Sequence, residues 1–360
     1  MAVHSPQSGA LIADVARCEA ADVDRAVKAA RAAQPGWTAT PLIERVQIMC
    51  RIHGLFATRA EEVLRHRGLS FPSTQEQTNN KRLVLTHRPL GVVGVITPYN
   101  FPTDIASIAL AHIIASGNTA VWKPSEFSPI CCNIIAEICS EAGLPPGVLN
   151  VVHGMGDIGA AIVEHGDVDG IFLTGSTAAG LRIAEKAALR PRLLELGGDG
   201  PATVLADADI DAAVAGAINA RFYYAGQVCT SGERLLVHAD IHAEFVSKLK
   251  ARVAQLRIGD PGLDDTDMGP LRGSATLACV VNHVEGARAL GAEVTQYGTV
   301  NINETSNYWD QLAPFGGTGN SGLGRKLSQW FLERFTEQKL LVFDLGDTEV
   351  RYNRRAEGGW

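Results

Sequence analysis

The sequence lacks the features of a membrane protein and of a nucleic-acid-binding protein. Its longest apolar stretches, 91–96 and 105–115, are too short or too interrupted for a membrane-spanning helix, which needs about 20 apolar residues. Basic residues are not in excess, because 32 Lys and Arg stand against 39 Asp and Glu and leave a net charge of −7. This charge argues against nucleic acid or an anionic membrane as the main partner.

Paired cysteines and a signal peptide are missing as well. The seven cysteines are odd in number and show neither metal-ligand nor disulfide-framework spacing. The segment 1–6 has neither the basic region nor the apolar region of a signal peptide. We therefore expect a cytoplasmic protein with reduced thiols and no metal site. Aromatic residues make up only 6% of the chain, so they favour neither aromatic nor aliphatic ligands.

The chain does contain ample material for a folded core. Its 360 residues are 46% hydrophobic and 20% charged, which is typical of a soluble globular protein of about two domains. Runs of β-branched residues alternate with stretches of helical periodicity, and this alternation predicts an α/β fold with a Rossmann-like doubly wound domain. The polar stretch 65–81 has no periodicity and is predicted to be an exposed connection. Predicted strands are 82–87, 91–96, 119–122, 149–152, 170–173, 202–205, 234–238 and 339–343; predicted helices start at Asp22 and cover 42–64, 209–225 and 240–257.

Two residues suggest covalent catalysis. Cys229 lies in a Gly-bearing loop, 224–230, and Glu195 lies in the apolar segment 194–198. A thiolate attacks carbonyl carbon, and a carboxylate activates water, so this pair suits an enzyme that forms and hydrolyses a thioester. A single cysteine is more often a small buried hydrophobe, so the neighbouring segments must carry the argument.

A third candidate is Asn100, in the loop 97–102 after the buried strand 91–96. Open α/β sheets place their ligands at such strand ends. The Asn100 amide N–H can stabilise an oxyanion that forms when Cys229 attacks a carbonyl. The alternative is a turn asparagine that bonds its own backbone.

Two further strand ends suit a dinucleotide. Lys123 and Glu126 follow the strand 119–122 and can donate to and accept from ribose hydroxyls; the carboxylate disfavours a 2′-phosphate, which favours NAD over NADP. The alternative is a solvated turn with a surface ion pair. Gly175 and Ser176 lead from a strand into a helix whose N-terminus suits a pyrophosphate, although the sequence is not the usual glycine fingerprint and an ordinary capped helix is the alternative.

Together these segments resemble a known family. TPYNFP, WKPSE, FLTGSTAAG, LELGG and GQVCTSGE occur in that order, and PFGG with NSGLG follows near the end. This series is similar to the aldehyde dehydrogenase superfamily, from about Ile12 to Leu345. The resemblance implies NAD-dependent oxidation of an aldehyde to a carboxylic acid, with NADP as the less favoured cofactor.

The resemblance also implies residue roles. Cys229 would form a thiohemiacetal with the aldehyde, and Asn100 and the Cys229 backbone N–H would hold its oxyanion. After hydride transfer to the nicotinamide, Glu195 would deprotonate the water that hydrolyses the thioester. The expected cofactor-binding residues are Lys123, Ser125 and Glu126 for the adenosine ribose, Gly175 and Ser176 for the pyrophosphate, and Thr97, Pro98, Gly180 and Leu196.

By the same resemblance the chain divides into an NAD-binding domain at 1–195, a reduced α/β catalytic domain at 196–312 and a returning segment at 313–360. We expect a homodimer or homotetramer, with the strand 82–88 in an oligomerisation sheet and 339–343 in an intersubunit sheet. His53, Phe101, Tyr223, Tyr224 and Trp309 are possible pocket residues, but core packing or a surface role is favoured for each.

Two parts of the family pattern are missing. Members carry further helices and the outgoing strand of an oligomerisation hairpin where this chain has only the stretch 65–81. The segment 291–298 also passes directly into 299–303, without the block that carries the Glu-x-Phe-Gly-Pro motif and its nicotinamide-ribose glutamate. Two alternatives to the dehydrogenase therefore stay open: a binding or structural paralogue, and a cofactor-independent thiol esterase.

Overall fold

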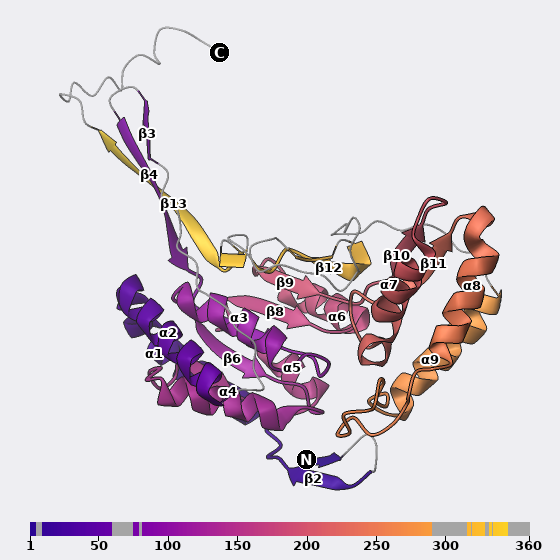
Figure 1. Cartoon of the computed structure of the whole chain (residues 1–360). Helices are drawn as coiled ribbons and strands as arrows, with labels where there is room; N and C mark the ends of the chain where they lie inside the picture. Colours follow the sequence, from indigo (N-terminus) through magenta and orange to yellow (C-terminus); the bar gives the residue numbers. More distant parts are fainter. Residues whose placement is uncertain are drawn as a thin grey trace.

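A six-stranded sheet forms the centre of the protein (Figure 1). The computed structural model describes residues 1–4, 9–59, 75–78, 81–289, 315–317, 319–327, 331–332 and 334–344. The strand order is β12-β9-β8-β5-β6-β7, and all neighbours are parallel except β12, which runs antiparallel to β9. The strands are β5 (Val92–Ile96), β6 (Thr119–Lys123), β7 (Leu149–Val151), β8 (Gly170–Thr174), β9 (Arg192–Glu195) and β12 (Gly322–Leu323).

Helices cover both faces of this sheet. Every residue of β6 and β8 is buried, as expected for central strands of a parallel sheet that is covered on both faces. One core cluster joins the sheet to α2 (Leu42–Arg59), α3 (Asp104–Ala115) and α4 (Pro129–Glu141). A second joins it to α1 (Ala20–Ala39), α5 (Gly156–Glu164) and α6 (Thr177–Ala187). The predicted doubly wound α/β fold is confirmed.

A second lobe is built on two parallel strands, β10 (Gly200–Val204) and β11 (Gly232–Val237). Their side chains pack with those of α7 and α8 in a separate core around Phe245, which is 1% exposed. The Asp209 carboxylate caps α7 by accepting from two backbone N–H groups. The helices of this lobe are α7 (Ile210–Phe222), α8 (Ala239–Val253) and α9 (Ser274–Ala289).

A three-stranded antiparallel sheet extends away from the body (Figure 1). It consists of β3 (Gln75–Thr78), β4 (Lys81–Pro89) and β13 (Thr336–Asp344), with β4 in the middle. The prediction that 65–81 is only a connection was wrong for β3, which supplies an outgoing hairpin strand. A polar strand that pairs through its backbone needs no apolar alternation, so sequence periodicity could not reveal it.

Other boundaries also differ from the sequence prediction. The helix expected over 209–225 ends at Phe222 and is followed by the short 3-10 helix η1 (Tyr223–Gly226). The hairpin of β1 (Ala2–His4) and β2 (Leu11–Asp14), together with β9, β12 and α9, was not predicted. The segments 60–64, 65–74, 79–80, 291–303 and 351–360 lie outside the described residues.

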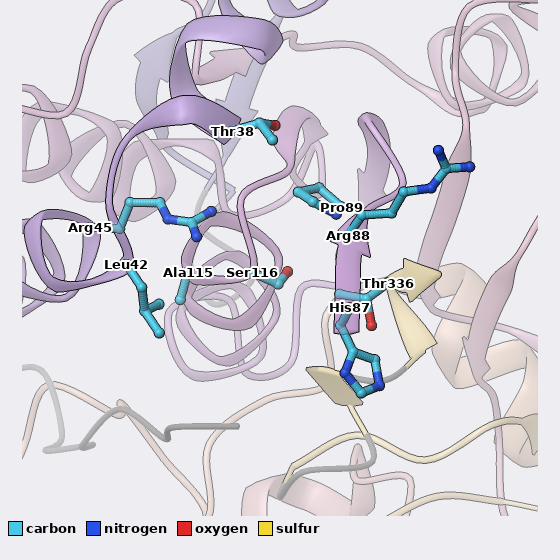
Figure 2. A pocket seen from close by; sticks show the side chains of 9 residues that line it. All are labelled: Thr38, Leu42, Arg45, His87, Arg88, Pro89, Ala115, Ser116 and Thr336. Carbon is cyan, nitrogen blue, oxygen red and sulfur yellow. The ribbon is translucent and has the colours of Figure 1, made fainter. Parts of the chain in front are cut away.

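A cavity of about 310 Å³ lies where the three-stranded sheet joins the body (Figure 2). None of the predicted site residues lines it. The cavity is lined by Thr38, Leu42, Arg45, His87, Arg88, Pro89, Ala115, Ser116 and Thr336.

Among the residues that the structure describes, no helix combines the length and the apolar character that a membrane span requires.

Candidate active site

The predicted site residues gather at one edge of the central sheet. Thr97 follows β5, Lys123 ends β6, Gly175 follows β8 and Glu195 ends β9. Because these four strands are parallel, their carboxyl ends meet at the same edge. Figure 1 shows the second lobe, with α7 and α8, on this side of the sheet.

Buried polar atoms without hydrogen-bond partners mark the same edge. Such atoms are rare in folded proteins and call for a ligand or water. Thr174 and His153 were not singled out from the sequence, and only their places at the ends of β8 and β7 point to them. In the described part of the chain, the unpaired atoms at this edge are Asn100 Oδ1, His153 Nδ1, Thr174 Oγ1 and Glu195 Oε1.

The loop before Cys229 has an unusual backbone. Tyr224, Ala225 and Gly226 all have positive φ, at 53°, 55° and 73°. Two of these residues carry a Cβ, so the left-handed conformation costs about 1 kcal/mol or more at each. Such strain persists where the surroundings fix the chain, and here it lies directly before the half-buried Cys229.

A glycine of the LELGG segment lets the Cys229 loop approach Glu195. A Cβ placed on Gly198 would lie 2.3 Å from the backbone oxygen of Cys229, which is closer than atoms can approach. A Cβ on the neighbouring Gly197 would have its nearest contact at 3.7 Å, from Thr177 Oγ1. The two glycines therefore differ: Gly198 is required for the contact with the cysteine loop, and Gly197 is not.

We expect Gly198→Ala to displace the Cys229 loop and to lower kcat about tenfold or more, because displacements of about 1 Å in a catalytic group have effects of that size. The rate of Cys229 alkylation by iodoacetamide should change in the same variant. Gly197→Ala is the matched control and should keep the melting temperature and the alkylation rate. If Gly198→Ala and Gly197→Ala have the same kcat and the same alkylation rate, the close approach at Gly198 does not position Cys229.

Glu195 is almost completely buried, with 4% of its surface exposed. Burial raises the pKa of its carboxyl group to about 7, while Lys326 and Arg325 act in the opposite direction. Lys326 Nζ lies 3.9 Å from Glu195 Oε2. A carboxyl group with a pKa near neutral pH can both accept and release a proton under physiological conditions.

The pKa of the Cys229 thiol is also raised, chiefly by burial. Lys326 lowers it, Glu195 raises it, and the backbone N–H groups of Cys229 and Thr230 lower it. The thiol and the carboxyl group therefore influence each other, as expected of groups in one site. Lys326 was not identified from the sequence, although its charge favours the ionised form of both.

Asn100 is held against the cysteine loop. Its Nδ2 donates a hydrogen bond of 2.8 Å to the backbone oxygen of Gln227. The Gln227 side chain in turn accepts from the Arg272 backbone N–H at 3.0 Å and from the Tyr99 hydroxyl at 3.4 Å. Because an amide nitrogen carries two hydrogens, one N–H of Asn100 is engaged in this contact and the other is left for a ligand.

Lys123 and Glu126 form an ion pair of 3.2 Å in which the Lys123 side chain is 6% exposed. Lys123 also lowers the pKa of His153, after the larger effect of burial. Two other predicted cofactor residues have internal partners: the Thr97 hydroxyl accepts from the Trp122 indole at 2.9 Å, and Ser125 Oγ accepts from the Phe127 backbone at 3.3 Å. The side-chain oxygens of Thr97 and Ser125 therefore have partners within the protein, while Lys123 and Glu126 bring charge to this edge of the sheet.

The α6 helix begins at the same edge. Ser176 caps it by accepting from the Ala179 backbone N–H at 3.2 Å. A Cβ on Gly180 would lie 2.5 Å from the Leu196 side chain, so the glycine lets α6 pack against the LELGG segment. N–H groups in the first turn of a helix have no intrahelical partner, and they suit an anion. This helix start, the unpaired Thr174 hydroxyl and the Lys123–Glu126 pair fit a dinucleotide.

The structure places some of the candidate pocket residues beside the cysteine loop and others elsewhere. Phe101 packs on the rings of Tyr223 and Tyr224, with centroid distances of 6.3 and 5.8 Å. Both tyrosines are about half exposed and adjoin the cysteine loop. His53 lies on α2, which packs against α3 and α4, and Trp309 lies outside the described residues. In the ranges that the structure describes, no cluster of three His, Cys, Asp or Glu could hold a metal ion.

Comparison with known proteins identifies the family. The sequence model of the Aldehyde dehydrogenase family matches residues 1–70, 64–296 and 292–341. The chain belongs to the aldehyde dehydrogenase family. The predicted resemblance and the assignment as an enzyme of this family are thereby confirmed.

Solved aldehyde dehydrogenase-fold proteins are similar over nearly the whole chain. PnpE in complex with nicotinamide adenine dinucleotide is 29% identical, with a TM-score of 0.89 over 99% of this chain and 96% of that one. Glyceraldehyde-3-phosphate dehydrogenase GapN from Methanocaldococcus jannaschii, complexed with NADP, is 25% identical, with a TM-score of 0.85 over 96% and 99%. The NAD⁺ complex of an aldehyde dehydrogenase from Bacillus cereus is 25% identical, with a TM-score of 0.85 over 96% and 93%. These relatives support a nicotinamide cofactor and include both NAD and NADP.

Proposed function

We propose that this member of the aldehyde dehydrogenase family oxidises an aldehyde to a carboxylic acid with NAD, through a thioester on Cys229. The observation that carries the proposal is the meeting of Cys229, Glu195 and Asn100 at the edge where Lys123, Glu126 and the start of α6 also lie. A nucleophile, a base, an oxyanion donor and groups for a dinucleotide are then in one place.

In the first step the Cys229 thiolate adds to the aldehyde carbon and forms a C–S bond, and the carbonyl electrons move to oxygen. The free N–H of Asn100 and the Cys229 backbone N–H stabilise that oxyanion. The nearby Lys326 charge favours the thiolate that this step requires.

Bound NAD supplies the acceptor for the hydride that leaves the former aldehyde carbon. On the protein, Lys123 and Glu126 would hold the adenosine ribose, and the N-terminus of α6 with Gly175 and Ser176 would hold the pyrophosphate. The Glu126 carboxylate would repel a 2′-phosphate, which is the argument for NAD over NADP.

In the last step Glu195 takes a proton from water, and the water oxygen attacks the thioester carbon. The C–S bond breaks, the thiolate of Cys229 is regenerated and the acid leaves. The unpaired Oε1 of Glu195 is the oxygen available for that water.

Purified protein mixed with NAD and a panel of aldehydes should form NADH, followed by its absorbance, with a lower kcat/KM when NADP replaces NAD. Ester hydrolysis without NADH from any aldehyde would instead support the thiol esterase. If neither activity appears and NAD does not raise the melting temperature, the chain is a binding or structural paralogue.

We also propose the domain division stated above and a homodimer or homotetramer. Pairing of β13 with β4 leaves β13 and β3 as the outer strands of their sheet within the described part of the chain, and outer strands can pair with another subunit. A monomer in light scattering would contradict the oligomer.

A further inference from the structure

A lysine is buried beside the proposed catalytic base. The side chains of Lys326 and Glu195 are 8% and 5% exposed, and their charged groups lie 3.9 Å apart. Lysine is almost never buried to this extent unless a charged partner compensates for the loss of water. The proposed reaction steps use the Lys326 charge at the Cys229 thiolate and give it no role at Glu195, so its place beside that carboxylate needs an explanation.

Contacts of Lys326 with Phe315, and the buried neighbour Leu327, hold the lysine in position. Lys326 and Phe315 form a bridge in which each backbone N–H donates to the other residue's oxygen, at 2.7 and 2.9 Å. Lys326 Nζ lies 4.7 Å from the centroid of the Phe315 ring, a favourable site for a cation. The next residue, Leu327, has a positive φ of 63° and is 1% exposed, so a buried side chain fixes a strained backbone beside the lysine.

Glycines of the C-terminal segment bring this lysine to Glu195. β12 pairs with β9 so that Gly322 lies opposite Glu195. A Cβ on Gly322 would lie 2.2 Å from the Leu194 backbone oxygen, and a Cβ on Gly316 would lie 2.8 Å from Glu195 Oε1. The C-terminal segment can therefore lie this close to Glu195 only because Gly316 and Gly322 have no side chain.

The two oxygens of Glu195 have different surroundings. Oε2 faces the Lys326 ammonium at a distance too long for a hydrogen bond, while Oε1 has no hydrogen-bond partner in the described residues. The other charged or titratable groups that act on this carboxylate are Arg325 and Cys229. Arg325 is engaged elsewhere, because its Nη1 donates to the backbone oxygens of Gly317 and Gly324 at 2.7 and 2.8 Å.

We propose that Lys326 is a positioning residue for Glu195, and that its charge keeps the carboxylate ionised beside Cys229 and so sets the pH at which the thioester is hydrolysed. This inference rests on the proposed function. The ion pair leaves Oε1 free for the attacking water, since Lys326 acts on Oε2 through its charge and forms no hydrogen bond that would compete. The same charge favours the thiolate, so one cation serves the nucleophile and the base.

The direction of the pKa effect agrees with this geometry. Burial raises the pKa of Glu195 to about 7, and Lys326 is the largest influence in the opposite direction. Without that cation the pKa of Glu195 would be higher still, and less of the carboxylate would be ionised at neutral pH. If the pKa rises by about one unit, the ionised fraction of Glu195 falls about fivefold at pH 7 and about tenfold well below it, and the loss of Lys326 should slow hydrolysis by the same factors.

The test follows hydrolysis of the acyl-enzyme that forms when the full-length protein reacts with p-nitrophenyl acetate, from about pH 5 to about pH 10. For the native protein we expect a rise with a midpoint near 7. Lys326→Met should move the midpoint up by about one pH unit or more, and Lys326→Arg, which keeps the charge, should restore it. Lys248→Met is the matched control, since Lys248 lies on α8 and pairs at the surface with Asp211 and Glu244.

An unchanged midpoint in Lys326→Met would overturn the proposal, whatever the rate. If that variant does not fold, Lys326→Gln gives the same comparison. Alkylation of Cys229 by iodoacetamide is a second measurement, and its midpoint should also move to higher pH without Lys326. Neither readout uses NAD, so the two proposals can fail separately. If the protein forms no NADH but the midpoint depends on Lys326, only the proposed oxidation is refuted. If the protein forms NADH but the midpoint is unchanged in Lys326→Met, only the role of Lys326 is refuted.

Discussion

Cys229→Ser is expected to lower kcat/KM for aldehyde oxidation about 10³-fold or more, because a serine hydroxyl is a far weaker nucleophile than a thiolate at neutral pH. The substitution removes little volume, so the half-buried site should keep its shape. NAD should still raise the melting temperature of the variant, since the proposed cofactor groups lie on β6, α6 and their loops. NADH formation and thermal melting measure the two effects separately.

Cys50→Ser is the control for this substitution. Cys50 is exposed and lies on α2, which packs against α3 and α4. Its replacement should leave NADH formation unchanged. Oxidation that survives in Cys229→Ser would mean that another group forms the covalent bond, or that no covalent bond forms.

Glu195→Gln is expected to lower steady-state turnover about 10²- to 10⁴-fold, the range for loss of a general base. Glutamine keeps the size of the side chain but cannot accept the proton of the attacking water. If hydride transfer precedes hydrolysis, the variant should still form a burst of about one NADH per site and then stop. Mass spectrometry of the intact protein should show the acyl group retained on Cys229.

The pH dependence gives a separate test of the same residue. Hydrolysis in the native protein should increase as the pH rises through about 7, because Glu195 acts in its ionised form. In Glu195→Gln this increase should be absent. A variant that hydrolyses its thioester at the native rate would exclude Glu195 as the base.

The raised pKa also affects stability, and the sign is opposite to that of an ordinary salt-bridged carboxylate. The pKa of Glu195 is about 7 in the folded protein, against an ordinary value of 4.5. Between these values the folded state binds more protons than the unfolded state, so the contribution of Glu195 becomes unfavourable as the pH rises through this window. Melting temperatures of Glu195→Gln and of the native protein should be compared at about pH 4.5 and about pH 7. The stability of the variant relative to the native protein should be greater at the higher pH.

Much of the fold could be predicted from local patterns. β6 and β8 are buried along their whole length and β5 over its first four residues, and such strands are visible in sequence because both faces need apolar side chains. β3 and β12 were missed for the opposite reason: one is polar and the other has only two residues. β12 pairs with β9, which lies far away in the chain, and β3 pairs with the neighbouring β4.

The candidate site could be predicted in its residue types but only partly in its arrangement. Cys229, Glu195 and Asn100 were identified by the chemistry of their side chains and by the order of the motifs. Their roles stay predictions that the variants above test. Lys326 was missed because a lysine in a polar stretch gives no sign that folding will bury it. Thr174 was missed because the sequence does not show that its buried hydroxyl lacks a hydrogen-bond partner.

The sequence by itself determined the alternation of strands and helices, the cap at Ser176, and the nucleophile and carboxylate available for catalysis. These are local properties, fixed by periodicity and by the chemistry of single side chains. Only the tertiary structure decided that Glu195 is buried with a raised pKa and that Lys326 lies 3.9 Å from it. The physical reason is that burial and electrostatic interaction depend on distances between segments that are far apart in the chain and meet only after folding.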